Sequence, residues 1–204
     1  MEGSVAAAGK RRRLSPEARR ELIVDAAVRY FAEVGLTGVT RDLAKRAGIT
    51  QPLLYKYFAS KAELMEAVFE HVYLDRLDPA WPRLLRDRTR PLKDRLGDFY
   101  RAYTRAIFTY EWLRIFMFAG LAGEPLNRRY LEHLRDLLLT SLLDEVREKA
   151  TGARPPDMED IWNLHGSLIY LGIRKFIYQL PVPDDIDPLI DRAIDRFLGD
   201  FGLS

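Results

Sequence analysis

The stretch QPLLYKYF, residues 51–58, carries side chains that could contact DNA bases and phosphates. In a helix, Leu54 and Phe58 lie one turn apart on the same side, so the other side chains point outward or flank that side. These side chains belong to Gln51, Pro52, Leu53, Tyr55, Lys56 and Tyr57. Glutamine can hydrogen-bond an adenine edge, leucine can contact a thymine methyl group, and tyrosine and lysine can reach phosphates. The stretch predicts a helix that enters a DNA major groove, the alternative being a weakly apolar face that packs on a neighbour.

The elements that would present this helix surround it in the chain. Residues 40–47 predict a short helix with Thr40 as its N-cap, followed by a three-residue turn that contains glycine. Two short helices joined in this way form a helix-turn-helix, whose first helix crosses the DNA backbone. We also predict a helix over residues 16–34 that begins after Ser15, and a fourth helix that begins with a capping box at Ser60.

Basic residues are concentrated in the N-terminal part of the chain. The net charge is only +2, but residues 1–60 hold eleven lysines and arginines against six acidic residues, a balance of +5 that leaves −3 for the remainder. We predict that residues 1–14 are a disordered basic tail, and that Arg12 and Arg13 lie along the DNA or enter the neighbouring groove. A charge run of this kind can also be a solvated face without a partner.

Composition favours an intracellular protein. The 204 residues are 48% hydrophobic and 30% charged, and they include no cysteine, which excludes disulfides and cysteine-based zinc or redox sites. The longest apolar run, residues 115–123, is far shorter than the roughly 20 residues of a membrane helix. No strand pattern is evident. We therefore predict an all-α chain that is cytoplasmic and binds no membrane.

Common enzyme motifs are missing from the sequence. The three histidines, His71, His133 and His165, are far apart, and none belongs to a His-Glu-x-x-His motif. A Gly-x-Ser-x-Gly motif and phosphate-binding glycine motifs are also absent. We therefore predict no catalytic residue, no metal and no cofactor. A structural helical adaptor is the other alternative, although it would not need the basic tail or the outward Gln, Tyr and Lys side chains.

Residues 20–70 closely resemble the DNA-binding domain of the TetR family of bacterial transcriptional regulators. The resemblance rests on AAVRYFAEVGL, TRDLAKRAGIT and QPLLYKYFASKAEL, about a quarter of the chain. It implies a three-helix DNA-reading domain followed by a larger helical domain that dimerises and binds a small effector, and it favours repression. By this resemblance the DNA-facing residues are Thr40, Arg41, Gln51, Pro52, Leu53, Tyr55, Lys56, Tyr57 and Lys61. The segment between Gly35 and Arg41 is one residue shorter than is usual in that family, which bears on the placement of Thr40.

The remainder of the chain predicts four longer helical segments. They span residues 92–121, 126–150, 158–180 and 186–201, and a break is expected within the first. The first is rich in aromatic residues, most of which belong in a core, but tyrosine and tryptophan also bring the polar groups of a ligand pocket. We predict that an apolar or aromatic effector binds among Tyr103, Trp112, Phe116, Trp162 and His165. A histidine in such a place is more often an ordinary core residue than a ligand contact.

The last two segments are expected to form a homodimer. Gly166 and Gly172 permit close approach of another helix, and residues 186–201 carry a broad apolar stripe that includes Ile194 and Phe197. We place a helix-turn-helix DNA-binding domain at residues 15–61 and an effector-binding and dimerisation domain at residues 62–204. The expected protein binds a pseudo-palindromic operator in double-stranded DNA as a homodimer and is released by its effector.

Overall fold

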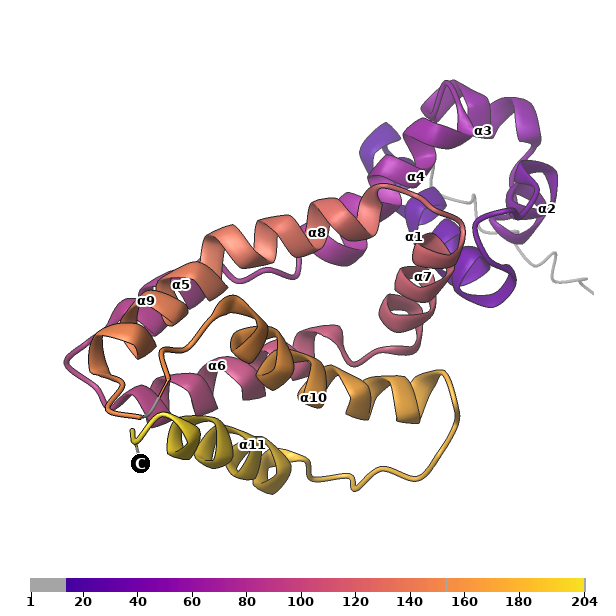
Figure 1. The fold of residues 1–204 in the computed structure, drawn as a ribbon. Coiled ribbons are helices and arrows are strands. Elements are labelled where there is room, and N and C mark those ends of the chain that lie inside the picture. Colours follow the sequence, from indigo (N-terminus) through magenta and orange to yellow (C-terminus); the bar gives the residue numbers. More distant parts are fainter. Residues whose placement is uncertain (1–13, 153, 204) are drawn as a thin grey trace, which may run out of the picture.

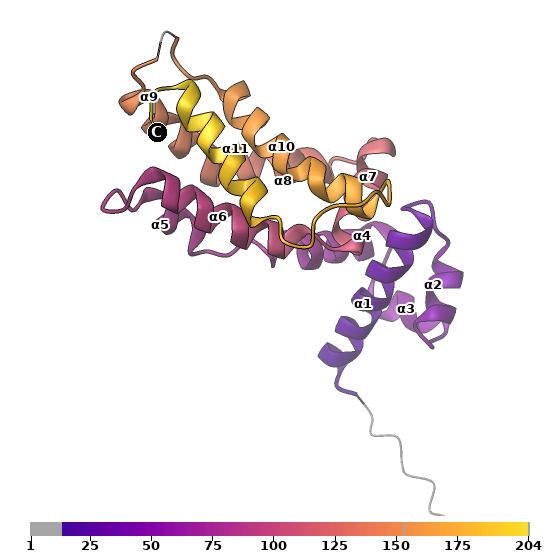
Figure 2. The ribbon, with the colours of Figure 1, turned by 90° about the horizontal axis from the view of Figure 1, so that it is seen from below.

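The computed structural model describes residues 14–152 and 154–203, and over these residues the chain is all-helical, as the sequence predicts (Figure 1). No strand occurs within these two ranges. The predicted tail, except for its last residue, lies outside the described residues, and so do Arg12 and Arg13. A small group of N-terminal helices stands at one end of a longer helical bundle (Figures 1 and 2).

The three N-terminal helices form the predicted helix-turn-helix arrangement. They are α1 (Pro16–Val34), α2 (Thr40–Arg46) and α3 (Gln51–Tyr57). The Ser15 hydroxyl accepts a hydrogen bond from Ala18 N (3.1 Å) at the start of α1, and the Thr50 hydroxyl accepts one from Leu53 N (3.4 Å) at the start of α3. Both side chains satisfy backbone N–H groups that a helix leaves unpaired at its first turn, so the sequence fixes where α1 and α3 begin.

A compact core holds these helices together. Leu54 and Phe58, in the stretch of residues 51–58, are fully buried, as their spacing predicts. Phe31 and Leu43 are fully buried with them. The turn between α2 and α3 passes through Gly48, whose φ of 66° lies in the left-handed region that favours glycine. The inward side of α3 is thereby fixed, and its other sides face outward.

The prediction that Thr40 caps α2 is wrong. Val39 occupies the N-cap position in an extended conformation, and no side chain bonds to the helix end there. The Val39 N–H instead donates to the Tyr30 hydroxyl (2.9 Å). Because the segment before α2 is short, Thr40 is already the first helical residue, and its hydroxyl is bonded to side chains of α3 rather than to the backbone of α2.

The helix α4 (Lys61–Phe69) connects the N-terminal group to the bundle, because it continues directly into the π-helical turn η1 (Glu70–Leu74). The Ser60 hydroxyl caps α4 by accepting from Glu63 N (3.1 Å), as predicted. The return bond differs from a capping box, since the Glu63 carboxylate accepts from Ala59 N (2.6 Å) rather than from the backbone of Ser60. A π turn inserts one extra residue into the helical ladder and often marks a functional position.

The predicted segment 92–121 is two helices, α6 (Leu92–Ile107) and α7 (Tyr110–Leu121). The chain leaves the helical conformation at Phe108, where ψ is 63°, and the Thr109 hydroxyl then caps α7 by accepting from Trp112 N (3.2 Å). A short helix, α5 (Trp81–Arg86), precedes α6 and was not expected from the sequence. Pro79 precedes this helix and Pro82 is its second residue, and two prolines so close together obscure any helical periodicity.

Four further helical elements and a second π turn complete the bundle. They are α8 (Leu126–Leu134), η2 (Arg135–Leu139), α9 (Thr140–Lys149), α10 (Met158–Phe176) and α11 (Asp187–Asp200). The elements from α8 to α9 form one continuous rod, as the predicted segment 126–150 requires. Helices α10 and α11 lie side by side, with α6 against α11 (Figures 1 and 2). α1 contacts α7, so the N-terminal group is packed on the bundle.

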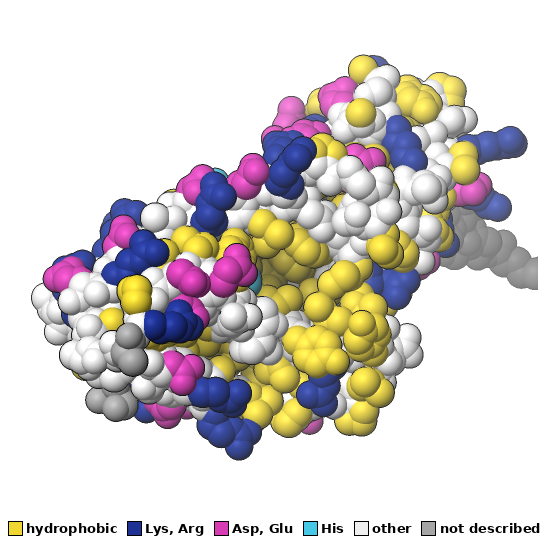
Figure 3. Space-filling view, in the orientation of Figure 1, with side chains coloured by type: hydrophobic (Ala, Val, Ile, Leu, Met, Phe, Trp, Pro, Cys, Tyr) yellow, Lys and Arg dark blue, Asp and Glu magenta, His cyan; other side chains and the backbone are white. Residues whose placement is uncertain are grey.

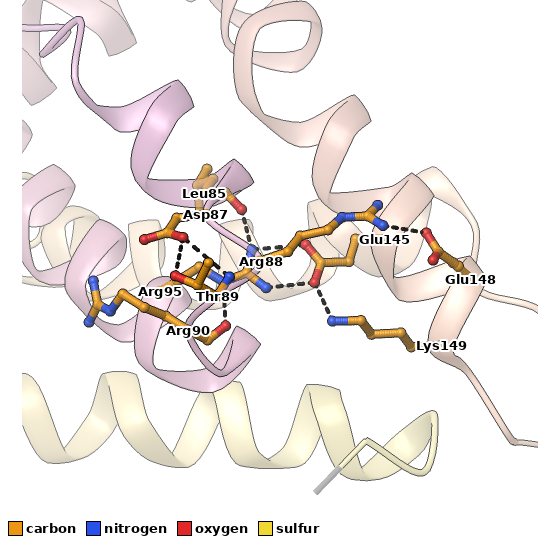
Figure 4. Close-up of polar contacts among 9 residues, drawn as sticks. All are labelled: Leu85, Asp87, Arg88, Thr89, Arg90, Arg95, Glu145, Glu148 and Lys149. Carbon is orange, nitrogen blue, oxygen red and sulfur yellow. Dashed lines mark hydrogen bonds and ion pairs between the residues drawn. The ribbon is translucent and has the colours of Figure 1, made fainter.

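A buried ion pair ties α6 to α9 (Figure 4). The Arg95 side chain is fully buried, and 4% of the Glu145 side chain is exposed. Two hydrogen bonds join them, from Arg95 Nη1 to Glu145 Oε2 (2.9 Å) and from Arg95 Nη2 to Glu145 Oε1 (2.5 Å). The remaining Arg95 donors reach the carbonyl oxygens of Arg90 (Nε, 3.1 Å) and Leu85, while Lys149 Nζ approaches Glu145 Oε1 (2.5 Å). The bonds from Arg95, followed by those from Lys149, lower the pKa of Glu145 to about 2. The pair therefore fixes the turn between α5 and α6 to α9.

Candidate DNA-binding surface and aromatic cluster

The outward face of α3 carries most of the side chains predicted to contact DNA. Tyr55 and Lys56 are exposed together with Pro52, whereas Gln51 and Leu53 are half-buried. Tyr57 and Lys61 are also half-buried, and Arg41 at the start of α2 is exposed. Because Leu54 is held in the core, this face is fixed relative to α1 and α2.

Hydrogen bonds between side chains join the start of α2 to α3. Thr40 Oγ1 lies 3.0 Å from the Tyr55 hydroxyl and accepts from Gln51 Nε2 (3.2 Å), and Thr40 itself is only 8% exposed. The structure thus brings three of the predicted residues together in one network, which the sequence alone did not indicate. The network holds the side chains of Gln51 and Tyr55 in defined positions on the outward face. Preorganised side chains lose less entropy when they bind a partner.

The basic residues around this face differ in whether other side chains of the protein already contact their charged groups. Arg41 and Lys56 are exposed. Arg46, the last residue of α2, forms an ion pair with Glu33, and its guanidinium lies 5.0 Å from the centre of the Tyr30 ring. Lys61 Nζ lies 5.9 Å from the centre of the Phe31 ring. Arg41, Lys45 and Lys56, all of them exposed, are therefore the cations of α2 and α3 with the best access to phosphates.

Polar contacts join α1 and α4 to the bundle. Arg129 on α8 makes a bidentate ion pair with Glu66 on α4, with distances of 2.9 and 2.7 Å. Arg114 on α7 donates through Nε to the carbonyl oxygen of Ala32 on α1 (2.6 Å). A displacement of α7 within the bundle would therefore pull on α1, and a displacement of α8 would pull on α4.

The five residues predicted to bind an effector form two groups within one aromatic cluster. The His165 ring lies 5.3 Å from the Tyr103 ring and 5.7 Å from the Trp162 ring, measured between ring centres. The Trp112 and Phe116 rings are stacked at 5.0 Å. Tyr130, which was not predicted from the sequence, joins the groups. Its hydroxyl lies 2.9 Å from the Tyr103 hydroxyl, and its ring lies 5.4 Å from that of Trp112. A lone tyrosine on a distant helix gives no sequence signal for such a contact.

We use the name aromatic cluster for Tyr73, Tyr100, Tyr103, Trp112, Phe116, Tyr130, Trp162 and His165. Tyr103, Trp112 and His165 are buried, whereas Phe116 and Trp162 are partly exposed. Figure 3 shows hydrophobic side chains gathered around a hollow between α8 and α10. The two partly exposed rings come from α7 and α10. The role of the five residues in effector binding stays a prediction.

Several buried polar atoms of this cluster have no hydrogen-bond partner. They are the Tyr100 hydroxyl, Trp112 Nε1 and His165 Nδ1, in side chains of residues that are 0%, 2% and 5% exposed. Burial lowers the pKa of His165 to about 4 and raises the pKa of Tyr100 well above its ordinary value. Both side chains are therefore neutral near pH 7. A buried polar atom without a partner is costly, so this concentration of them is unusual for a plain core.

The outward sides of α10 and α11 differ from the predicted apolar stripe. Ile194 and Phe197 are buried within this chain, so they belong to its own core. Gly172 also serves an internal contact, because a Cβ there would come within 2.8 Å of side-chain atoms of Phe108 and Leu113. A groove of about 610 Å³ runs between the two helices, and its lining includes Tyr170, which is 51% exposed. Leu189 and Ala193 also line it.

Two further features concern metals and membranes. Within residues 14–152 and 154–203, no group of three or more His, Asp or Glu side chains is placed to hold a metal ion. None of the helices in these ranges has both the length and the apolar character that crossing a membrane requires.

Comparison with known proteins points to one family. A sequence model described as "Bacterial regulatory proteins, tetR family" matches residues 23–68. The HTH-type transcriptional repressor KstR2 of Mycolicibacterium smegmatis is 35% identical over 89 residues, which are 43% of this chain and 43% of KstR2. The HTH-type transcriptional repressor SCO4008 of Streptomyces coelicolor is 32% identical over 150 residues, which are 70% of this chain and 73% of SCO4008.

Solved structures show the same fold over most of the chain. The fatty acid degradation regulator FadR from Bacillus halodurans has a TM-score of 0.70 and 18% identity, and the match covers 95% of this chain and all of FadR. Among the relatives by sequence, the match spans less than half the length of KstR2 and 73% of the length of SCO4008.

Proposed function

The chain belongs to the TetR family of bacterial regulatory proteins, and on this basis we propose that it is a ligand-responsive transcriptional repressor. It binds a pseudo-palindromic operator in double-stranded DNA as a homodimer, and a small, mainly apolar or aromatic effector releases it. Residues 15–61 form the DNA-binding domain, and residues 62–204 bind the effector and dimerise. The protein acts by binding and catalyses no reaction.

The outward face of α3 is the observation that carries this proposal. Leu54 anchors the helix, and Thr40 positions the side chains of Gln51 and Tyr55 from the neighbouring helix. Lys56 stands exposed beside them. The face therefore offers an amide group for base edges and a cation for phosphates, a combination that suits a major groove.

The proposed route of release runs through Tyr73 in η1. The Tyr73 ring lies 5.1 Å from the Trp112 ring and 5.5 Å from the Tyr130 ring, and its hydroxyl donates to the Trp112 carbonyl oxygen (3.4 Å). Because η1 continues from α4, an effector that displaces these rings would tilt α4 and move Lys61 at its other end. The effector must bind better to the tilted state, and operator DNA must then weaken effector binding by the same factor.

The proposed dimer uses the outward sides of α10 and α11. Tyr170 and the half-buried Leu189 and Ala193 leave apolar surface there that an identical pair of helices could cover. Two such pairs would form a four-helix bundle with the two-fold symmetry of a palindromic operator. One α3 alone makes too few base contacts for useful specificity, so the symmetry is part of the proposed function.

The experiment that tests DNA binding is the salt dependence of affinity for a random-sequence duplex. Lys56→Ala removes one phosphate contact from each protomer, so we expect weaker binding and a slope of log K against log salt that is smaller in magnitude by about 2. Lys175→Ala is the matched control, because Lys175 is also exposed but lies on α10. Equal affinity and equal slope for Lys56→Ala and the control would contradict the proposed role of α3.

A further inference from the structure

The buried polar atoms without partners are all associated with the aromatic cluster. Within the described residues there are four: the Tyr100 hydroxyl, Trp112 Nε1, His165 Nδ1 and Asn127 Oδ1. Three belong to the cluster itself. The fourth belongs to Asn127, whose Nδ2 donates to the carbonyl oxygen of Phe116 (2.7 Å). Four unsatisfied atoms around one cluster indicate a place where a bound molecule supplies hydrogen bonds.

The arrangement of the rings favours a flat molecule. Trp112 and Phe116 are nearly parallel, with 11° between their planes, whereas Tyr130 and Tyr73 meet Trp112 edge-on. Phe116 and Trp162 are the partly exposed members, on α7 and α10. A planar apolar body can stack on or meet the edges of such rings with little loss of conformational entropy.

The charges near the cluster are already paired or bonded. The half-buried Arg76, which lies near Tyr73, donates through Nη1 to the carbonyl oxygen of Ala106 (3.0 Å) and to the Thr109 hydroxyl (3.3 Å). Arg95 and Glu145 neutralise each other. Burial keeps His165 neutral near pH 7, since its pKa is lowered to about 4. A buried ammonium group would therefore lack a partner of opposite charge. A buried carboxylate could pair only with Arg76, whose guanidinium is already held by the Ala106 carbonyl oxygen and the Thr109 hydroxyl, so either ion costs more to bury than a neutral group.

We propose that the aromatic cluster binds an uncharged, flat, mainly apolar molecule that carries hydroxyl or carbonyl oxygens, and that Tyr100, Trp112 and His165 recognise those oxygens. The inference rests on the proposed function, in which an effector binds this cluster, and it adds the chemical class of that effector. The indole N–H of Trp112 can only donate, so the ligand must present an acceptor there. The Tyr100 hydroxyl can donate or accept, which suits a ligand hydroxyl at the other end of the cluster.

Four probes with one ring system test the class of ligand: 2-naphthol, naphthalene, 2-naphthoate and 2-naphthylmethylammonium. We expect calorimetry on the full chain at pH 7 to show that 2-naphthol binds the tightest, with the two ions about tenfold weaker or more. Equal or tighter binding of either ion would overturn the proposal, and so would failure of 2-naphthol to bind at millimolar concentration.

Conservative variants test the recognising atoms. Tyr100→Phe keeps the aromatic ring and removes only the hydroxyl, so 2-naphthol affinity should fall about threefold to tenfold while naphthalene affinity stays the same. Trp112→Phe also shortens the ring system, so the loss of its N–H is measured as a fall of the same size in the ratio of 2-naphthol affinity to naphthalene affinity. Tyr178→Phe is the control, because Tyr178 is exposed and lies beyond the end of α10. Tyr100→Phe should not lower the melting temperature, since it removes a polar atom that has no partner in the protein. Trp112→Phe should lower it, because the smaller ring leaves a cavity in the core. Unchanged 2-naphthol affinity in both variants would overturn the assignment.

A parallel titration on a random-sequence duplex separates this inference from the proposed function. If 2-naphthol binds as expected but does not weaken duplex binding, the proposed release by effector fails and the ligand class stands. If the duplex binds with the expected salt slope but none of the probes binds, the ligand class fails and the DNA-binding role stands.

Discussion

Glu145→Gln is expected to lower the free energy of unfolding by about 3–5 kcal/mol, because it leaves the buried Arg95 guanidinium without a counter-charge. Glu148→Gln provides the control: Glu148 also pairs with an arginine, Arg88, at 2.8 Å, but both side chains are more than half exposed. An exposed pair of this kind contributes about 0–1 kcal/mol. Urea unfolding of all variants at one protein concentration measures the difference, and equal midpoints for the two variants would contradict the account.

The same pair predicts how stability depends on pH. The folded pKa of Glu145 is lowered to about 2 from its ordinary 4.5, so the carboxylate's stabilisation is complete above about pH 4.5 and is lost as the pH falls toward 2. In Glu145→Gln this part of the acid dependence should be absent. The double variant Arg95→Met/Glu145→Leu removes both buried charges and should recover most of the lost stability, because the only charge left without its partner is that of Lys149, which is partly exposed to solvent.

Tyr170→Glu is expected to convert the proposed dimer into a folded monomer and to weaken operator binding by about 100-fold or more, since two linked reading helices gain that much from effective concentration. Tyr170 is the better probe than Ile194 or Phe197, because a charge at either of those buried positions would disrupt the chain's own core. Leu121→Glu is the control, as Leu121 is a large exposed hydrophobic residue at the end of α7.

Sedimentation velocity gives the mass of each variant, and circular dichroism shows whether helicity is retained. A monomeric wild-type chain at micromolar concentration would contradict the proposed dimer. Unchanged mass and operator affinity for Tyr170→Glu would exclude this face of α10 as the interface.

The helix-turn-helix could be predicted from the sequence because its signals are local. Ser15, Thr50 and Ser60 each cap the helix that follows, and Leu54 and Phe58 are spaced by one turn. The capping role assigned to Thr40 failed because the side chains of α3 compete for its hydroxyl, and that competition depends on tertiary structure. The break at residues 108–109 was equally hard to place, since aromatic residues continue through it without a proline or glycine.

Contacts in the bundle between residues far apart in the chain could not be predicted from the sequence. Arg95 and Glu145 lie 50 positions apart, and Tyr103 and Tyr130 lie 27 apart, so no periodicity relates either pair. The prediction did find five members of the aromatic cluster, because tyrosine and tryptophan in an apolar helix suggest a pocket. It could not find Tyr73, whose place in the cluster depends on η1 and on its packing against α7.

The most direct measurement of the central claim is selection of bound sequences from a library of random DNA duplexes, with the wild-type chain and with Gln51→Ala. We expect the wild type to enrich a pseudo-palindrome whose half-sites are separated by about 34–36 Å along the duplex, or a multiple of it. In the Gln51→Ala selection, base preference should relax at symmetry-related positions of both half-sites, by about 1–3 kcal/mol of discrimination at each. Failure of the wild type to enrich any sequence, or enrichment of one without two-fold symmetry that Gln51→Ala leaves unchanged, would contradict the account.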